Sequence, residues 1–182
     1  MEIMSNIRKK KWIDSKTGDM YDLSHTTPTI FEFGVKLSRD AEIEKIQVKV
    51  FFSNHCYSRE CFENDPVHFR EEKRNGTVEN RTFCVDRWEF SKKLPRIISE
   101  LGNKTCLQGG QKEVLYRLED SDPVNPSHGW YLCMRMGYRP NKIPSIELSV
   151  RSIHWRSNRP IDIRGGSQRF YVLLSKLIKQ HA

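Results

Sequence analysis

Apolar residues alternate along two segments of this chain with the two-residue period of a β-strand. The segments are residues 29–37 and 43–52, and their apolar positions are Ile30, Phe31, Phe33, Val35, Ile46, Val48 and Val50. Successive side chains of a strand point to opposite faces, so this spacing places an apolar face against a core. β-branched and aromatic residues are also favoured in strands. The sequence therefore predicts two strands, which can pair with each other.

Three further strands are expected at residues 113–118, 130–138 and 145–155, separated by loops rich in proline and glycine. Their order indicates an antiparallel meander. In the last of them, the two-residue period puts His154 on the inward face of Ile146, Leu148 and Val150. It puts Arg151 and Trp155 on the opposite face.

Two segments carry the pattern of an amphipathic helix. The first begins near Ser91, tolerates Pro95 in its first turn and ends at Gly102. The second follows Gly165-Gly166. The apolar positions of the two helices are Leu94, Ile97, Ile98 and Leu101, and then Phe170, Leu173, Leu174, Leu177 and Ile178.

These elements predict an α+β fold: an antiparallel sheet with a central helix, and an amphipathic C-terminal helix packed on it. We expect residues 29–182 to form a single domain with a charged loop near residues 60–80. Residues 1–28 are expected to form a polar arm or a small hairpin that joins Trp12-Ile13 to Met20-Tyr21.

The excess positive charge of the chain lies at one end. The formal net charge is +8, and residues 135–179 hold ten Lys and Arg against two acids, with Trp155 and Phe170 among them. Arginines beside rings that can stack are typical of a surface that binds phosphate backbones. A solvated basic face without a partner is the alternative. The candidate nucleic-acid-binding residues are Arg135, Arg139, Arg151, Trp155, Arg156, Arg159, Arg164 and Arg169.

Three residues are candidates for acid–base and phosphate chemistry. His55 and Arg59 follow a predicted strand, and His154 lies inside the basic third. Histidine can exchange a proton near neutral pH, and arginine can stabilise a charged phosphate, so this set suits metal-independent RNA cleavage. The alternative for His154 is a packing role on the inward face.

A Cys/His-rich stretch contains possible zinc ligands, which are His55, Cys56, Cys61, His68 and Cys84. Their spacing is not a strong zinc pattern, and the chain has no phosphate-cradling glycine loop, so we predict no metal and no cofactor. Five cysteines without a C-x-x-C pair suit free thiols in a reducing compartment. No apolar run is long enough to cross a bilayer, so a cytoplasmic protein with no membrane partner is expected.

Four short segments resemble the small ribonuclease toxins of the RelE and BrnT type. The first segment is Ser53-Asn54-His55-Cys56-Tyr57-Ser58-Arg59, and the other three are Tyr116-Arg117, Met134-Arg135 and Arg151-Ser152-Ile153-His154. The resemblance covers residues 43–156. It implies a compact basic RNA-cleaving domain and an antitoxin partner.

Three classes of function follow from the sequence. The first is a protein that binds RNA or DNA, such as an accessory or regulatory factor of a mobile element. The second is a metal-independent ribonuclease of the toxin type. The third is a protein-interaction domain whose Leu173–Ile178 stripe docks a partner.

Overall fold

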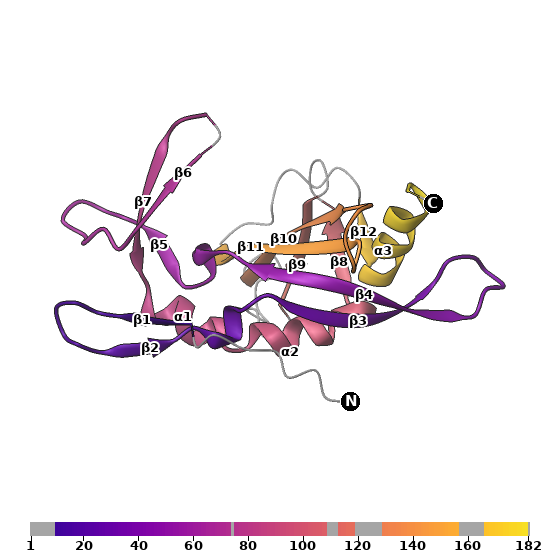
Figure 1. Cartoon of the computed structure of the whole chain (residues 1–182), viewed down its shortest axis with the longest axis horizontal. Helices are drawn as coiled ribbons and strands as arrows, with labels where there is room; N and C mark the ends of the chain where they lie inside the picture. Colours follow the sequence, from indigo (N-terminus) through magenta and orange to yellow (C-terminus); the bar gives the residue numbers. More distant parts are fainter. Residues whose placement is uncertain (1–9, 74, 109–112, 119–128, 157–165, 182) are drawn as a thin grey trace.

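The computed structural model describes residues 10–73, 75–108, 113–118, 129–156 and 166–181. Over these residues the chain is mostly β. The strands form a seven-stranded sheet, a three-stranded sheet and a two-stranded hairpin. Figure 1 shows the long seven-stranded sheet curling like half of a barrel, with the smaller sheet at one end.

The seven-stranded sheet is mixed. Its strands, from one edge to the other, are β12 (Ser167–Arg169), β8 (Thr105–Gln108), β9 (Glu113–Arg117), β10 (Gly129–Tyr138), β11 (Ile146–Arg156), β4 (Ile43–Phe52) and β3 (Thr29–Lys36). All neighbours are antiparallel except β11 and β4, which run parallel. The predicted β3 and β4 pair and the β9–β10–β11 meander are confirmed.

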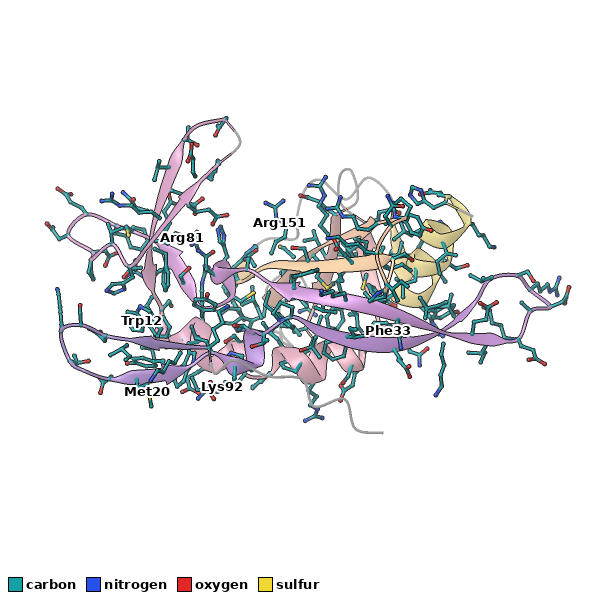
Figure 2. All side chains as sticks on the ribbon, viewed as in Figure 1. Trp12, Met20, Phe33, Arg81, Lys92 and Arg151 are labelled. Atoms are coloured by element: carbon teal, nitrogen blue, oxygen red, sulfur yellow. The ribbon has the colours of Figure 1, made fainter. Side chains whose placement is uncertain are left out.

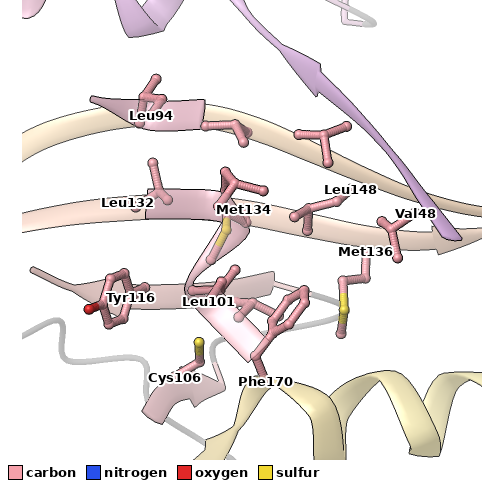
Figure 3. Close-up of a cluster of buried hydrophobic side chains, with 14 of the residues drawn as sticks. Val48, Leu94, Leu101, Cys106, Tyr116, Leu132, Met134, Met136, Leu148 and Phe170 are labelled. Atoms are coloured by element: carbon pink, nitrogen blue, oxygen red, sulfur yellow. The ribbon is translucent and has the colours of Figure 1, made fainter. Parts of the chain in front are cut away.

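The parallel pairing of β4 with β11 joins these two local units. Val48 lies opposite Ile146 and Val50 opposite Leu148, and all four side chains are buried. Figure 3 shows Val48 and Leu148 in one apolar cluster with Leu132, Met134 and Phe170. Burial of apolar surface from both units is the favourable term that sets this pairing.

The predicted central helix is two short helices. Helix α1 spans Val85–Ser91, α2 spans Leu94–Ser99, and a 3₁₀ turn, η3, spans Leu101–Asn103. Ser91 ends α1, where its hydroxyl donates to the Trp88 carbonyl at 2.7 Å, and α2 begins three residues later without a side-chain cap. Pro95 has no backbone N–H to bond a preceding turn, so it lies in the first turn of α2.

The C-terminal helix α3 (Phe170–Lys179) contacts both edge strands of the curled sheet, β12 and β3. The ring of Phe170 lies 5.2 Å from that of Phe33, and Ser175 Oγ donates to the Lys36 carbonyl at 3.1 Å. Helix α3 thus lies across the open side of the half-barrel. The predicted fold class, an antiparallel sheet with helices packed on it, is wrong, because the sheet is mixed and curled and the helices are short.

Residues 60–80, predicted as a charged loop, contain strand segments with connecting residues between them. They supply most of a second sheet with the order β5 (Ser58–Glu60), β7 (Val78–Phe83) and β6 (Phe69–Glu72). Arg81 is buried in it, where its guanidinium donates to Ser58 and pairs with Glu79. Strands whose buried positions hold charged residues lack the apolar alternation by which strands are predicted.

The predicted N-terminal hairpin is confirmed as β1 (Lys11–Ile13) paired with β2 (Met20–Asp22). A 3₁₀ turn, η1 (Ser24–Thr26), leads from it to β3. An aromatic cluster joins the hairpin to the small sheet and α1, and its members are Trp12, Tyr21, Tyr57, Phe69, Phe83 and Trp88. No helix in the described residues is long and apolar enough to span a membrane.

Candidate nucleic-acid interface

A β-bulge at Arg151 determines which side chains share a face of the large sheet. Met134 pairs with Val150 and Cys133 with Ser152, so Arg151 is an extra residue in β11. Ser53, just after β4, holds this irregularity: its N–H donates to the Val150 carbonyl at 3.0 Å and its hydroxyl to the Arg151 carbonyl at 2.5 Å. A bulge re-aims the side chains that follow it.

The bulge reverses the predicted facing of the end of β11. Ile153 is fully buried, and His154 lies on the opposite face beside Cys133. The prediction that His154 shares the inward face of Val150 is therefore wrong. Trp155 lies opposite Trp130, with the rings 6.0 Å apart, and so is not on the face of Arg151 as predicted.

We call the surface of β4, β10 and β11 that faces away from α2 and α3 the outer face. Arg135 and Arg151 are both exposed there, on adjacent strands. Figure 2 shows Arg151 directed away from the sheet on the side opposite to Phe33. A groove of about 500 Å³ runs over this face, and its lining includes Arg135, Ser149 and Phe51.

Cations outnumber carboxylates on the outer face. Arg139 and Lys142 share one carboxylate, Glu147, at 3.0 and 3.4 Å, and Arg151 lies 4.0 Å from Glu113. The hydrogen bond from Arg139 lowers the pKa of Glu147, so this acid stays ionised. The described cations in and beside the groove are Lys49, Arg135, Arg139, Lys142 and Arg151, and the carboxylates among them are Glu147 and Glu113.

Phe51 is the aromatic residue of this groove. It lies opposite Ser149, and the Lys49 ammonium is 5.4 Å from the centre of its ring. Neither residue was singled out from the sequence. The signal was available, because the period that buries Val48 and Val50 places Lys49 and Phe51 on the other face.

The remaining predicted binding residues are not gathered on the outer face. Arg169 is exposed on the edge strand β12, which β8 and β9 separate from β10. Trp155 lies beside Trp130, on which Phe90 stacks at 4.9 Å. The Arg156 side chain, Arg159 and Arg164 lie outside the described residues.

The three predicted catalytic residues are divided between the two sheets. His55, in the 3₁₀ turn η2 (Asn54–Cys56), bonds Glu71 at 2.8 Å. Arg59 in β5 forms a bidentate ion pair with Asp65, and the hydrogen bonds from Arg59 lower the pKa of the Asp65 carboxyl. His154 lies on the large sheet, with Ser152 Oγ 3.3 Å from its Nδ1. His55 and Arg59 are thus engaged with carboxylates, whereas His154 lies on the outer face.

The possible zinc ligands do not converge in the part of the chain that the structure describes. There, no three Cys, His, Asp or Glu side chains lie together in a metal-binding arrangement. Cys56 is buried, and His68 Nδ1 accepts a hydrogen bond from the Phe83 amide at 3.0 Å.

The comparisons with known proteins give one finding. A family model described as the YjaZ family matches residues 10–178, which is most of the chain. No curated protein and no solved structure matches it. Because the family model covers well over half of the sequence, the chain belongs to the YjaZ family.

Proposed function

We propose that the protein binds nucleic acid along the outer face of its large sheet. One observation carries the proposal: Arg135 lines a groove together with Phe51, and Arg151 is exposed on the adjacent strand of the same face. The two guanidinium groups are exposed and the carboxylates around them are fewer than the cations. Neutralising phosphates with such groups releases condensed counterions and drives binding.

The chemistry of the groove favours single strands over duplexes. Arginine forks match phosphate oxygens, and an aromatic ring can stack on an unpaired base. In a duplex the bases stack on each other and their faces are not available to Phe51. The ligand class that fits best is therefore single-stranded RNA or DNA.

Charge reversal tests this proposal. Arg135→Glu with Arg151→Glu should weaken the binding of a fluorescently labelled 20-nucleotide single strand by at least about tenfold, because two phosphate contacts become repulsions. Fluorescence anisotropy at several salt concentrations measures the effect. Each arginine that contacts a phosphate of a single strand contributes about 0.7 to the salt slope, so the slope should also fall.

The matched control changes the same charge elsewhere. Lys16→Glu with Lys36→Glu alters two exposed lysines, one in the hairpin turn and one at the end of β3. This variant should bind like the wild type. Equal loss in both variants, or affinity that does not respond to salt, would contradict a specific site on the outer face.

Ribonuclease activity is a second candidate, favoured by one observation. His154 lies on the outer face, as does Arg151, so a proton-transfer group accompanies the basic groove. A denaturing gel of the RNA recovered from the binding samples tests this activity. Cleavage that is abolished by His154→Ala and unchanged by His55→Ala would support an enzyme. The antitoxin partner that the toxin resemblance implies stays a prediction.

A further inference from the structure

The sulfur of Cys133 lies beside the imidazole ring of His154. Cys133 is half-buried on the outer side of β10, and its Sγ lies 4.0 Å from both ring nitrogens of His154 on β11. Ser152 Oγ is 3.3 Å from Nδ1 of the same ring. The facing of His154 depends on the bulge at Arg151, so the tertiary structure creates this thiol–imidazole pair.

Two of the other four thiols are inert by burial. Desolvation raises the pKa of Cys56 and of Cys106 to about 12, so neither is ionised near neutral pH. Cys61 and Cys84 are half-buried like Cys133. The sulfur of Cys61 contacts the Pro66 carbonyl at 3.8 Å, which is an acceptor and gives no help to a thiolate.

Two described cations lie near Cys133, with one carboxylate between them. Arg135 lies two residues along the same strand and so on the same face, and Arg151 adjoins Ser152, the residue that pairs with Cys133. Glu113 of β9 pairs with Arg135 and lies 4.0 Å from Arg151. A cysteine reacts as its thiolate, and reactive thiols are found in partly exposed, electropositive places beside a histidine. The imidazole of His154 can accept the thiol proton, and the arginines favour the resulting negative sulfur.

We propose that Cys133 is a covalent modification site for soft electrophiles, with His154 as the positioning residue that assists its ionisation. In the step, the thiol proton passes to the imidazole and the sulfur electron pair forms a bond to the electrophilic carbon. With an alkyl halide, the halide leaves with the electrons of its bond to carbon, and His154 then returns the proton to solvent. The site does not depend on the nucleic-acid proposal, since it needs no ligand on the groove.

Brief labelling of the native full-length protein with iodoacetamide, followed by peptide mass spectrometry, tests the site. Cys133 should be alkylated at least about tenfold faster than Cys61 and Cys84, which have comparable burial. Cys56 and Cys106 should stay unlabelled until the protein is unfolded with urea, so they report the integrity of the fold within the same sample.

Two variants test the role of the neighbours. His154→Asn should slow labelling of Cys133 about tenfold and move its pH–rate profile to higher pH, while the rates at Cys61 and Cys84 stay constant. Arg135→Gln should move the profile in the same direction by less, and it serves as the alternative where His154→Asn exposes Cys56 or Cys106. A wild-type Cys133 that reacts no faster than Cys61 and Cys84, or an unchanged pH profile in the folded variants, would overturn the proposal.

Discussion

His25 links the N-terminal hairpin region to helix α1 through one hydrogen bond. It lies in η1, and its Nε2 is 2.6 Å from the hydroxyl of Ser91, which is fully buried. Because that hydroxyl donates its own proton to the Trp88 carbonyl, its oxygen accepts from the His25 ring. Partial burial lowers the pKa of His25, Lys92 and Lys10 lower it further, and Asp22 opposes them.

Stability should therefore fall on acidification below about pH 6.5. The unfolded chain takes up a proton at the ordinary histidine pKa of about 6.5, whereas the folded protein does so only at lower pH. Between these two values the unfolded state binds more protons, so the free energy of unfolding decreases as pH falls. Urea unfolding of wild type and His25→Gln from pH 7.5 to 5 measures this. The variant should lose part of the pH dependence, and identical slopes would contradict the assignment.

At the scale of elements, α3 holds the two edges of the large sheet. Its apolar side chains Phe170, Leu173, Leu174 and Leu177 are buried. The backbone N–H of Phe170 donates to the Lys104 carbonyl at 3.0 Å, just before β8, and Ser175 bonds the end of β3. The helix that lies across the open side of the half-barrel is thus tied to both of its ends.

Phe170→Ala should destabilise the protein strongly. Removing a fully buried phenylalanine costs about 3–5 kcal/mol, through lost burial and the cavity that remains. Denaturant unfolding measures the loss as a lower midpoint with a similar slope. Ile143→Ala is the control, because Ile143 is 99% exposed and its truncation leaves no cavity. Equal unfolding midpoints for the two variants would show that the burial of Phe170 in α3 does not stabilise the protein.

Most long elements were predictable from their own residues. Strands β3 and β4 carry the two-residue alternation, and α3 carries a helical stripe, because each presents one apolar side to the core. Strands β8 and β12 were missed because they are short, and β12 consists of Ser167, Gln168 and Arg169. Such segments become strands only when a neighbouring strand bonds their backbone.

At the scale of the whole molecule, the aromatic cluster extends the hydrophobic core to the N-terminal hairpin. Trp12 of the hairpin stacks on Phe83 of the small sheet at 4.2 Å, and Tyr21 meets Trp88 of α1 edge-on at 4.9 Å. The indole N–H of Trp88 donates to the Asp22 carbonyl at 2.8 Å. The N-terminal hairpin is joined here to a segment far along the chain, the end of β7 and the start of α1.

Trp12→Ala should release the hairpin from this cluster. Each aromatic pair contributes about 1 kcal/mol beyond area burial, so local opening should increase by about tenfold or more. Limited trypsin digestion, followed by mass spectrometry, should detect faster cleavage after Lys11 and Lys16. Met20→Ala is the control, since Met20 is in the same hairpin but 65% exposed. Equal cleavage of the two variants would contradict anchoring by Trp12.

The sequence by itself determined the local units and where the charge lies. The alternation of 43–52, the stripe of α3 and the basic end of the chain depend only on neighbouring residues, so they can be read without a fold. Arg135 and Arg151 were identified as basic, but their position side by side on one face of the sheet was not determined by the pattern.

Only the tertiary structure decided the composition of the site. Parallel pairing of β11 with β4 joins residues about a hundred positions apart, and it brings Phe51 and Ser53 to β11. The bulge at Arg151 then moves Trp155 off the outer face and puts His154 beside Cys133. A one-residue shift reverses every later side chain of a strand, and its position is set by cross-strand hydrogen bonds that local sequence does not contain.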